Sequence, residues 1–472
     1  MKRRKKGICK KVGMGVLMAT LLCTPFTNLP ISATETTNTE KVTQESDGDN
    51  TVKVAIKTSG YGSVYHSAIS VTSDNAYTLS NGKKTKNYRA KKKVTVRTSN
   101  GMLKNGQSIW VMPAGAGKTK ITSITRSMGT PSYAGKLEIK NVSGKGLVVI
   151  NHVDIEDYLY GVVGSEMSSS FAGEALKAQA VAARSFALSS VNSSTYANIG
   201  ADFDDSTSYQ VYNNTTEDSK IKSAVDSTKG QVVKANQKVV KTYFFSTSFG
   251  KTALPSELWG GTEVDSAYNS EGQTEEAKAD LSDNEEFESF LEDTDETGWE
   301  AKQDWYRWSA TISAGNMTKQ VNRKLKTCYF SYPSSFKVKD KKGNWVSKSI
   351  SGVGKVKSVT VTERAASGLV QEIEIVGGSG SVRIHNSNAI RTVMAPYYDK
   401  LVKKNGSTVS KLCNLPSGFF AIESNDKGGF ILQGGGYGHG VGMSQNGANA
   451  MAKAGEDYKT ILLHYFKNVD IS

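Results

Sequence analysis

The sequence predicts a mixed α+β protein, and three observations lead to this prediction. Residues 51–150 contain short runs of alternating apolar and polar residues, separated by Gly, Asn and Ser clusters, which is typical of strands. Residues 174–188 lack Gly and Pro and are dense in Ala, which predicts a helix. The C-terminal part again mixes strand-like runs with short helical segments. We therefore expect one large body around a central buried Ala-rich helix, with the β-rich N-terminal part packed on it.

The N-terminus has the composition of a targeting segment. Seven Lys and Arg residues and no acid occur in residues 1–33, and a basic stretch precedes an apolar run of about a dozen residues. This pattern predicts a signal peptide over residues 1–33, and an uncleaved membrane anchor is the alternative. Residues 34–50 are polar and have too few apolar side chains to form a core, so we expect a disordered linker there.

The β-rich region is predicted from individual runs. The clearest are TVKVAI from residue 51, VYHSAISVTS, KKVTVRTS, SIWVMP and KTKITSI. LEIKNV and GLVVINHV flank Ser143–Lys145, so we expect a hairpin with its turn at these residues.

The segment from Gly161 to Leu188 is the centre of the predicted body. Its helix begins near Glu174, with Ser170 as the expected N-cap. Gln179 falls among apolar side chains on the helical projection, so its amide must find hydrogen-bond partners, either in a structural role or by fixing a loop or ligand. Glu166 precedes the helix on what reads as a turn beside apolar residues, and its pKa is a candidate for elevation.

Further elements follow the central helix. We expect a helix ending at Gly230, a strand up to the loop after residue 245, and a strand at 305–312. Residues 263–300 are strongly acidic and predict a surface insertion that is partly helical. A glycine-rich run surrounds His439, then one helix begins at Ser444 and a last helix covers residues 458–466.

Two long motifs resemble a known family. HVDIEDYLYGVVGSEM followed by EALKAQAVAARSFAL is similar to the signature of the stage II sporulation protein D and amidase-enhancer family of bacterial wall proteins. GGGYGHGVGMSQNGANAMAKAGEDYKTILLHYF resembles the closing motif of that family. The resemblance implies a β-rich region at 51–150 and a catalytic-like core at 151–472, interrupted by the acidic insertion.

Enzymes of this family cleave peptidoglycan glycan strands lytically, so the resemblance implies a lytic transglycosylase that acts on peptide-stripped strands. Glu166 is then the single acid and base. Some relatives hold zinc with His and Cys just before a Gln-Val-Tyr triplet; here Ser208 and Tyr209 precede Gln210, so we expect no metal and no cofactor. The expected substrate contacts are Gln179, Arg184, Gln210, Tyr212, Ser246, Ser248, Thr252, His439, Ser444 and Gln445.

The family also leaves a second function open. Some members are enhancers that stimulate an N-acetylmuramoyl-L-alanine amidase, so this chain could be a non-enzymatic modulator that binds the wall or such an amidase. A third reading is wall binding alone. All three predict a secreted, wall-associated protein, or a membrane-anchored extracytoplasmic one if the N-terminal segment stays uncleaved.

Charge and cysteine content add two expectations. After removal of residues 1–33 the chain carries 52 basic and 45 acidic residues, a modest excess that suits an anionic wall. We find no compact basic and aromatic patch typical of nucleic-acid binding. Cys328 and Cys413 survive signal removal and could form one disulfide in an exported chain.

Overall fold

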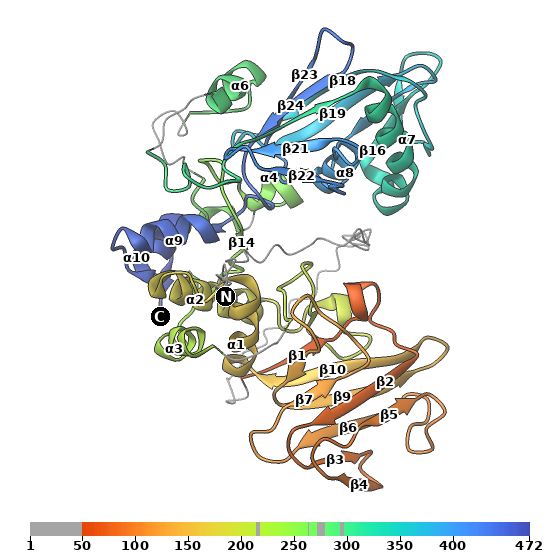
Figure 1. Cartoon of the computed structure of the whole chain (residues 1–472), viewed down its shortest axis with the longest axis vertical. Helices are drawn as coiled ribbons and strands as arrows, with labels where there is room; N and C mark the ends of the chain where they lie inside the picture. Colours follow the sequence, from red (N-terminus) through yellow and green to blue (C-terminus); the bar gives the residue numbers. More distant parts are fainter. Residues whose placement is uncertain (1–49, 214–217, 263, 271–278, 293–296) are drawn as a thin grey trace, which may run out of the picture.

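The computed structural model describes residues 50–213, 218–262, 264–270, 279–292 and 297–472. It is a mixed α+β protein, as predicted, and its parts follow one another along a curved molecule (Figure 1). The N-terminal β part lies at one end, a helical middle part follows, and a second lobe of strands and helices lies at the other end. The predicted signal peptide and all but the last residue of the predicted linker lie outside the described residues.

The N-terminal part consists of two sheets. A seven-stranded sheet has the order β11-β1-β10-β9-β6-β3-β4, and a four-stranded sheet has the order β5-β2-β7-β8. The expected hairpin forms, with β9 and β10 antiparallel around residues 143–145. The strands are β1 (Thr51–Ala55), β2 (Ala68–Ser73), β3 (Tyr77–Ser80), β4 (Thr85–Tyr88), β5 (Val94–Arg97), β6 (Ser108–Pro113), β7 (Thr119–Ile121), β8 (Ser132–Tyr133), β9 (Lys136–Val142), β10 (Gly146–Asp154) and β11 (Phe203–Asp204), with the short 3₁₀ helix η1 (Ser59–Tyr61) after β1.

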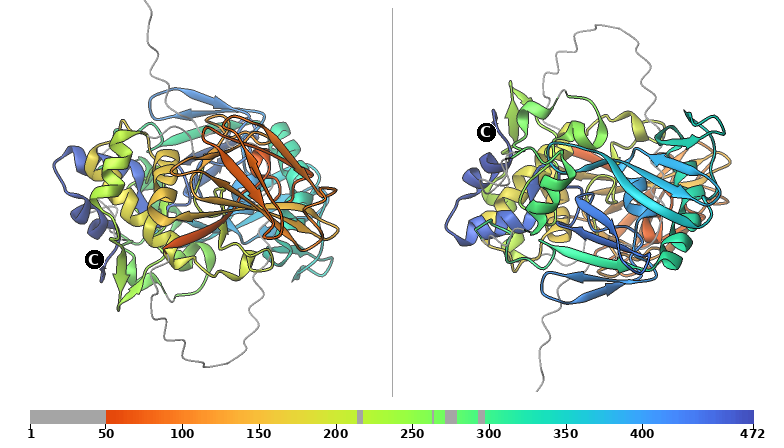
Figure 2. Two further views of the ribbon diagram at one scale, coloured as in Figure 1. Left: turned by 90° about the horizontal axis from the view of Figure 1, so that it is seen from below. Right: turned by 90° about the horizontal axis from the view of Figure 1, so that it is seen from above.

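The middle part is built around α2 (Gly173–Ser189), the expected Ala-rich helix. Its alanines are buried, and it contacts α1 (Ile155–Glu166), α3 (Ser219–Ser227), α9 (Gln445–Lys453) and α10 (Tyr458–Tyr465). Figure 2 shows these helices gathered on one side of the molecule. The N-cap is Ala172 and makes no side-chain cap bond, so the prediction of Ser170 as the N-cap was wrong. The remaining short elements of this part are η2 (Ser194–Tyr196), β12 (Val233–Ala235), β13 (Lys238–Val239), β14 (Phe244–Phe245), α4 (Pro255–Trp259), η3 (Asp265–Ala267), β25 (Met443–Ser444) and β26 (Asp470–Ile471).

The second lobe has a hydrophobic core of its own, between Trp308 and Leu432. We expected residues 151–472 to form one body with an insertion at 263–300; the structure adds α6 (Asn284–Glu292) within that range and then this complete lobe. The lobe holds two five-stranded sheets. Its elements are β15 (Trp308–Ile312), α7 (Ala314–Ser331), η4 (Pro333–Ser335), β16 (Phe336–Lys339), β17 (Trp345–Val346), β18 (Val356–Arg364), β19 (Val370–Gly377), β20 (Ser381–Ile384), α8 (Ser387–Val393), β21 (Lys400–Lys403), β22 (Thr408–Ser410), β23 (Phe420–Ser424) and β24 (Phe430–Gly434).

The chain returns from the second lobe to the middle part through the glycine-rich run. Gly434 and Gly435 pass so close to Trp308 and Phe249 that a Cβ atom at either glycine would lie within 2.6 Å of these side chains. After this passage β25 pairs in parallel with β14, and α9 and α10 pack on α2. The C-terminal motif therefore belongs to the same body as the Ala-rich helix.

Two further observations concern the cysteines and the apolar character of the helices. Cys328 is a free buried thiol, so the disulfide between Cys328 and Cys413 considered above does not form. Among the described residues, no helix has the length and apolar character that crossing a bilayer demands.

Candidate active site

Glu166 is the last residue of α1, a helix that packs against α2. The helix begins after Asp154, whose side chain accepts a hydrogen bond from the N–H of Glu156. The sequence predicted a turn at Glu166, just before the central helix. The helix continues through Gly161 and Gly164, and Gly164 allows the side chain of Ile221 to approach within 3.3 Å of where a Cβ would lie. The expected turn was therefore wrong, and a helix end presents the carboxyl group.

A buried ion pair fixes this helix against α2. The guanidinium of Arg184 donates to both carboxylate oxygens of Glu156, from Nε at 2.9 Å and from Nη2 at 2.6 Å. Arg184 is 1% exposed, and its Nη1 also donates to the carbonyl of Gln231. Such a bidentate pair sets both distance and angle between two helices. Arg184 therefore positions the helix that carries Glu166.

The carboxyl group of Glu166 is held by one backbone and one side-chain donor. The N–H of Val211 donates to Oε1 at 2.8 Å, and Nε2 of Gln445 donates to Oε2 at 3.3 Å. The residue as a whole is half-buried. Burial raises the pKa of Glu166 to about 7, and the two hydrogen bonds act in the opposite direction without cancelling it. At neutral pH a large fraction of Glu166 is therefore protonated.

The side-chain amides of Gln445 and Gln179 form a hydrogen-bonded pair, here called the relay, that can adapt to the protonation state of Glu166. Nε2 of Gln445 also lies 3.5 Å from Oε1 of Gln179, a residue that is 0% exposed. Nε2 of Gln179 is buried and has no hydrogen-bond partner. Rotating both amides by 180° lets Oε1 of Gln445 accept from a protonated Glu166 and from Nε2 of Gln179. The orphaned donor is then satisfied, so the pair accommodates both states of the carboxyl group.

The loop that supplies the Val211 N–H is fixed at both ends by the N-terminal β part. At its start Asp205 is buried and accepts from Arg126, whose guanidinium also donates to the carbonyls of Lys57 and Thr58. At its end the Tyr61 hydroxyl donates to Oδ1 of Asn213 at 2.7 Å. The guanidinium of Arg126 lies over the Tyr61 ring, 4.4 Å from the ring centroid.

Tyr61 has a backbone φ of 58°, a left-handed conformation that is uncommon for a bulky side chain. Asn213 in turn donates its N–H to Oγ of Ser165, the neighbour of Glu166, at 3.0 Å. Strained backbone at such a position is maintained only where the surroundings demand it. The link from Tyr61 to Ser165 thus positions both the loop and the end of α1.

The residues of this loop do not fit a zinc ion. Ser208 is exposed, and the Tyr209 ring packs against Phe203 and Tyr196 with centroid distances of 5.8 and 6.2 Å. Within the described ranges, no group of three or more His, Cys, Asp and Glu side chains is placed to hold a metal ion. Aromatic packing and the Arg126–Asp205 pair stabilise the loop in this chain, which explains how it is held without His and Cys at these positions.

His439 lies in an aromatic cluster and does not contact Glu166 through any described interaction. Its ring is near those of Tyr243, Phe245 and Trp259, with centroid distances of 6.1, 5.6 and 5.5 Å. Burial, helped by the positive charge of Arg391, lowers the pKa of His439 to about 4. The imidazole is therefore neutral at neutral pH and cannot serve as a proton donor there.

The other expected substrate contacts divide into two groups. Gln445 reaches Glu166 and so belongs to the site, whereas its neighbour Ser444 is buried and caps α9 through Gly447. Ser246 is partly exposed, and its carbonyl accepts from the N–H of Asn446. Five residues are buried and bonded within the protein, so nothing in the geometry supports direct contact with a ligand: Arg184, Gln210, Tyr212, Ser248 and Thr252.

Several residues around Glu166 were not predicted from the sequence. Tyr61, Ser165 and Asn213 position Glu166, and only Ser165 lies in a recognised motif. Trp259 is 47% exposed and stacks on Tyr243 at 4.3 Å beside His439. The sequence carried no signal for Trp259, because the exposure of its ring is decided by the fold.

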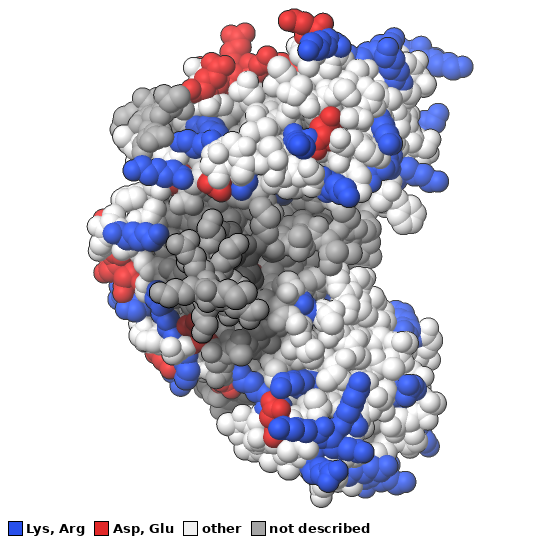
Figure 3. Space-filling view, viewed as in Figure 1, with Lys and Arg blue, Asp and Glu red and all other residues white. Residues whose placement is uncertain are grey.

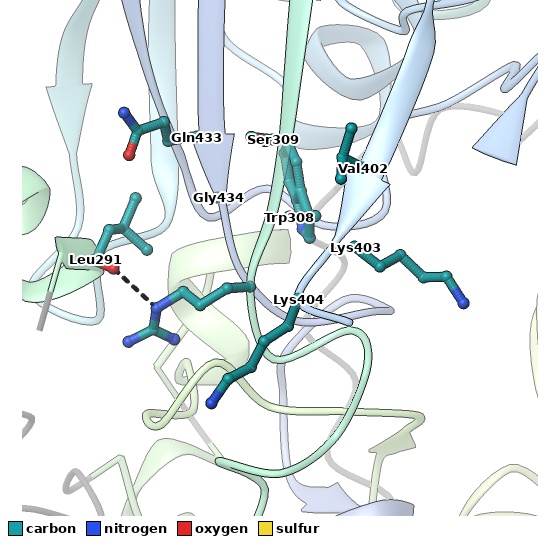
Figure 4. Close-up of a pocket in the computed structure, with 9 residues that line it drawn as sticks. Leu291, Trp308, Ser309, Val402, Lys403, Lys404, Gln433 and Gly434 are labelled. Atoms are coloured by element: carbon teal, nitrogen blue, oxygen red, sulfur yellow. Dashed lines mark hydrogen bonds between the residues drawn. The ribbon is translucent and has the colours of Figure 1, made fainter. Parts of the chain in front are cut away.

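A hollow of about 170 Å³ lies elsewhere, on the second lobe (Figure 4). It crosses β15, β21 and β24 and is lined by Trp308, Val402 and Gln433 among others. Its cations already have partners: Arg307 donates to the carbonyl of Leu291 at 3.0 Å, and Lys403 lies 3.2 Å from Asp304. None of the residues that line it has a described interaction with Glu166, so the carboxyl group of Glu166, and not this hollow, is the candidate site.

Comparisons with known proteins agree with the motifs. A family model described as stage II sporulation protein matches residues 143–234, the range that holds Glu166, Gln179 and Val211. Residues 143–234 of the chain are therefore similar to the stage II sporulation protein family. A second model, described as a domain of unknown function (DUF8618), matches residues 256–442 and so covers the second lobe.

Several curated proteins are similar to the chain over about two thirds of its length. The amidase enhancer of Bacillus subtilis (strain 168) is 27% identical over 66% of the chain and 40% of that protein. Stage II sporulation protein D of the same strain is 26% identical over 68% of the chain and 76% of that protein. An uncharacterized protein of Brachyspira hyodysenteriae is 29% identical over 69% of the chain and 68% of that protein. The chain thus spans about two fifths of the amidase enhancer's length.

Proposed function

We propose that this protein cleaves the glycan strands of peptidoglycan by a lytic reaction in which Glu166 is both acid and base. The observation that carries the proposal is the state of Glu166: a half-buried residue whose desolvated carboxyl group has a pKa of about 7 and is restrained by Val211 and Gln445. Hydrolytic glycosidases use two carboxylates that flank the bond. Among the described residues, no second carboxylate contributes to the pKa shift of Glu166. A single acid suits a reaction that needs no activated water.

The reaction proceeds in two steps. Protonated Glu166 first donates its proton to the glycosidic oxygen, the bond from that oxygen to the anomeric carbon breaks, and positive charge develops on the sugar ring. The resulting carboxylate then accepts a proton from the sugar's own 6-hydroxyl group, whose oxygen attacks the anomeric carbon. The product carries a 1,6-anhydro ring, and Glu166 is protonated again. A pKa near the working pH serves both steps, because the group must lose and regain one proton.

The groups around Glu166 have distinct roles in this scheme. Val211 and Gln445 stabilise the carboxylate formed after the first step. The relay of Gln445 and Gln179 accommodates the protonated form before it. Trp259, stacked on Tyr243, offers an exposed apolar face of the kind a sugar ring packs against. We infer that the aromatic cluster around His439, with the exposed ring of Trp259, binds part of the glycan strand by apolar contact.

The substitution Glu166→Gln tests the proposal. Purified peptide-stripped strands are incubated with each variant, and anhydro-muramyl ends are counted by mass spectrometry. The wild type is expected to release them, and Glu166→Gln to lose at least about 99% of the rate, as removal of a general acid does. Glu174→Gln is the matched control. Glu174 lies on α2 and pairs with Lys177 of the same helix at 2.7 Å, so this variant should cleave at the wild-type rate. Anhydro ends at the wild-type rate from Glu166→Gln would contradict the assignment.

A second function is favoured by one of the comparisons. The relative named amidase enhancer aligns over 66% of this chain, and the second lobe lies outside the range of the sporulation-protein model. In this alternative the protein stimulates an N-acetylmuramoyl-L-alanine amidase and does not cut glycan itself. Faster release of peptides only when an amidase is added, with no anhydro ends without it, would support the enhancer. Both functions would act in wall remodelling outside the cytoplasm, and the similarity to proteins named amidase enhancer and stage II sporulation protein D supports this setting.

A further inference from the structure

The positive charge of this chain is concentrated in one part of it. Residues 51–137 contain 15 Lys and Arg and a single acid, Asp74, whereas residues 138–472 contain 36 Lys and Arg and 39 acids. The modest overall excess therefore hides a strongly basic module followed by a slightly acidic remainder. Like charges repel one another and destabilise a compact fold. A ligand of negative charge would relieve the repulsion within this module.

The cations gather at one end of the N-terminal part. Figure 3 shows Lys and Arg side chains clustered at the lower end of the molecule, where Figure 1 labels β3, β4 and β5. We call the set of exposed cations between β3 and the end of β5 the basic edge. Its members are Lys83, Lys84, Lys86, Arg89, Lys91, Lys92, Lys93 and Arg97, all exposed. Asp74 is already engaged by Lys120 at 2.9 Å, and among the described residues none of the eight has an ion-pair partner.

The backbone presents these cations in a fixed arrangement. β4 is the last strand of the seven-stranded sheet and β5 the last strand of the four-stranded sheet, so the loop 89–93 joins two sheet edges. Lys91 adopts a left-handed φ of 63°, and its N–H donates to the carbonyl of Ser73 at 2.7 Å. The hydroxyl of buried Tyr77 donates to the carbonyl of Lys92. A strained loop anchored this way loses little conformational freedom when it binds an anion.

Protection of the sheet edges explains only part of the pattern. One or two lysines on an edge strand suffice to block pairing with another chain. Eight cations within fifteen residues, without one acid among them, exceed that need.

The aromatic content indicates what kind of anion fits. Proteins that bind single-stranded nucleic acids add aromatic side chains on which bases stack. The basic edge contains one aromatic residue, Tyr88, and its ring is stacked on Tyr77 at 5.3 Å and is half-buried. The basic edge is formed by the edges of two sheets and contains no helix that could enter the major groove of DNA. We propose that the basic edge binds a flexible phosphodiester polymer without bases, of the polyol phosphate kind, and so holds the protein on an anionic matrix.

The test compares two variants of the full-length protein with equal charge loss. The edge variant combines Lys84→Gln, Lys86→Gln, Lys92→Gln and Lys93→Gln. The control combines four exposed lysines of the second lobe: Lys337→Gln, Lys341→Gln, Lys342→Gln and Lys348→Gln. The probe is poly(glycerol phosphate), with binding measured at several salt concentrations.

We expect the edge variant to bind at least about tenfold more weakly, and the slope of log K against log salt to fall by about three, since each lost phosphate contact removes about 0.7 to 0.9. The control should change less than about twofold. An equal loss in both variants overturns the proposal, because net charge alone would then explain binding. Tighter binding of single-stranded DNA of equal charge, or of phosphatidylglycerol vesicles, than of the polymer also overturns it.

This inference does not rest on the cleavage reaction. Release of anhydro ends from soluble peptide-stripped strands should be the same for the edge variant and the wild type. Loss of polymer binding with unchanged cleavage supports the basic edge, whereas absence of cleavage in every variant contradicts only the proposed function.

Discussion

Replacing Glu166 by Gln should stabilise the protein at alkaline pH, because the wild-type fold holds this carboxyl group in surroundings that favour its neutral form. The pKa of Glu166 is about 7 in the folded protein, against 4.5 for an ordinary glutamate. A group whose pKa is raised on folding contributes most below its unfolded value, and the contribution is lost as the pH rises through its folded value. A shift of this size corresponds to about 3 kcal/mol, at roughly 1.4 kcal/mol for each pH unit.

The glutamine amide has the same shape, keeps the hydrogen bond from Val211 and does not ionise. The free energy of unfolding of Glu166→Gln, minus that of the wild type, should therefore grow by about 3 kcal/mol from pH 4 to pH 8.5. Urea unfolding followed by tryptophan fluorescence at both pH values measures this difference. Glu423→Gln, an exposed acid on β23, serves as the control and should show little change between the two. A difference for Glu166→Gln that is equal at pH 4 and pH 8.5 would refute the burial argument.

Three further predictions concern the groups around the carboxyl. Gln445→Leu removes a donor that stabilises the carboxylate, so the alkaline limb of the pH–rate profile should move up by about one unit; an unmoved limb contradicts the hydrogen bond. Tyr61→Phe breaks the bond to Asn213 and should lower the rate about tenfold while thermal unfolding shifts by only a few degrees; a wild-type rate would show that this link does not position the loop. Arg126→Met leaves Asp205 buried without its cation and should cost about 3 to 5 kcal/mol in urea unfolding, partly restored by adding Asp205→Asn; no restoration would mean that the charge pair is not the cause.

Much of the fold could be predicted where a local pattern decided it. The Ala-rich helix and the strands at 68–73 and 108–113 have regular patterns of burial that match their residue patterns. The end of α1 was predicted as a turn, whereas the helix continues to Glu166 and Gly164 allows Ile221 of α3 to pack closely. α7 was not predicted, although its buried Met317, Val321, Leu325 and Cys328 repeat at intervals of three to four residues, which is the period of a helix.

The candidate site was predictable in its acid but not in its supports. Glu166 was identified by its motif, and the fold joins it to Gln445, 279 residues away. Tyr61 and Asn213 are 152 residues apart and lie in no motif, so only the folded chain reveals their contact. Arg184 shows the opposite error: a cation within a motif looked like a ligand contact, but its partner Glu156 makes it a structural ion pair.

The N-terminal β part is therefore a component of the site and not an appendage. Arg126 and Tyr61 project from it to fix both ends of the loop that donates to Glu166. The same part turns its basic edge outward, at the far end of the two sheets. Because both proposed roles involve the same β part, attachment of that edge to an anionic matrix would hold the carboxyl group near the matrix. Where this protein acts would then be set by the charge of residues 83–97, and what it does there by the protonation of Glu166.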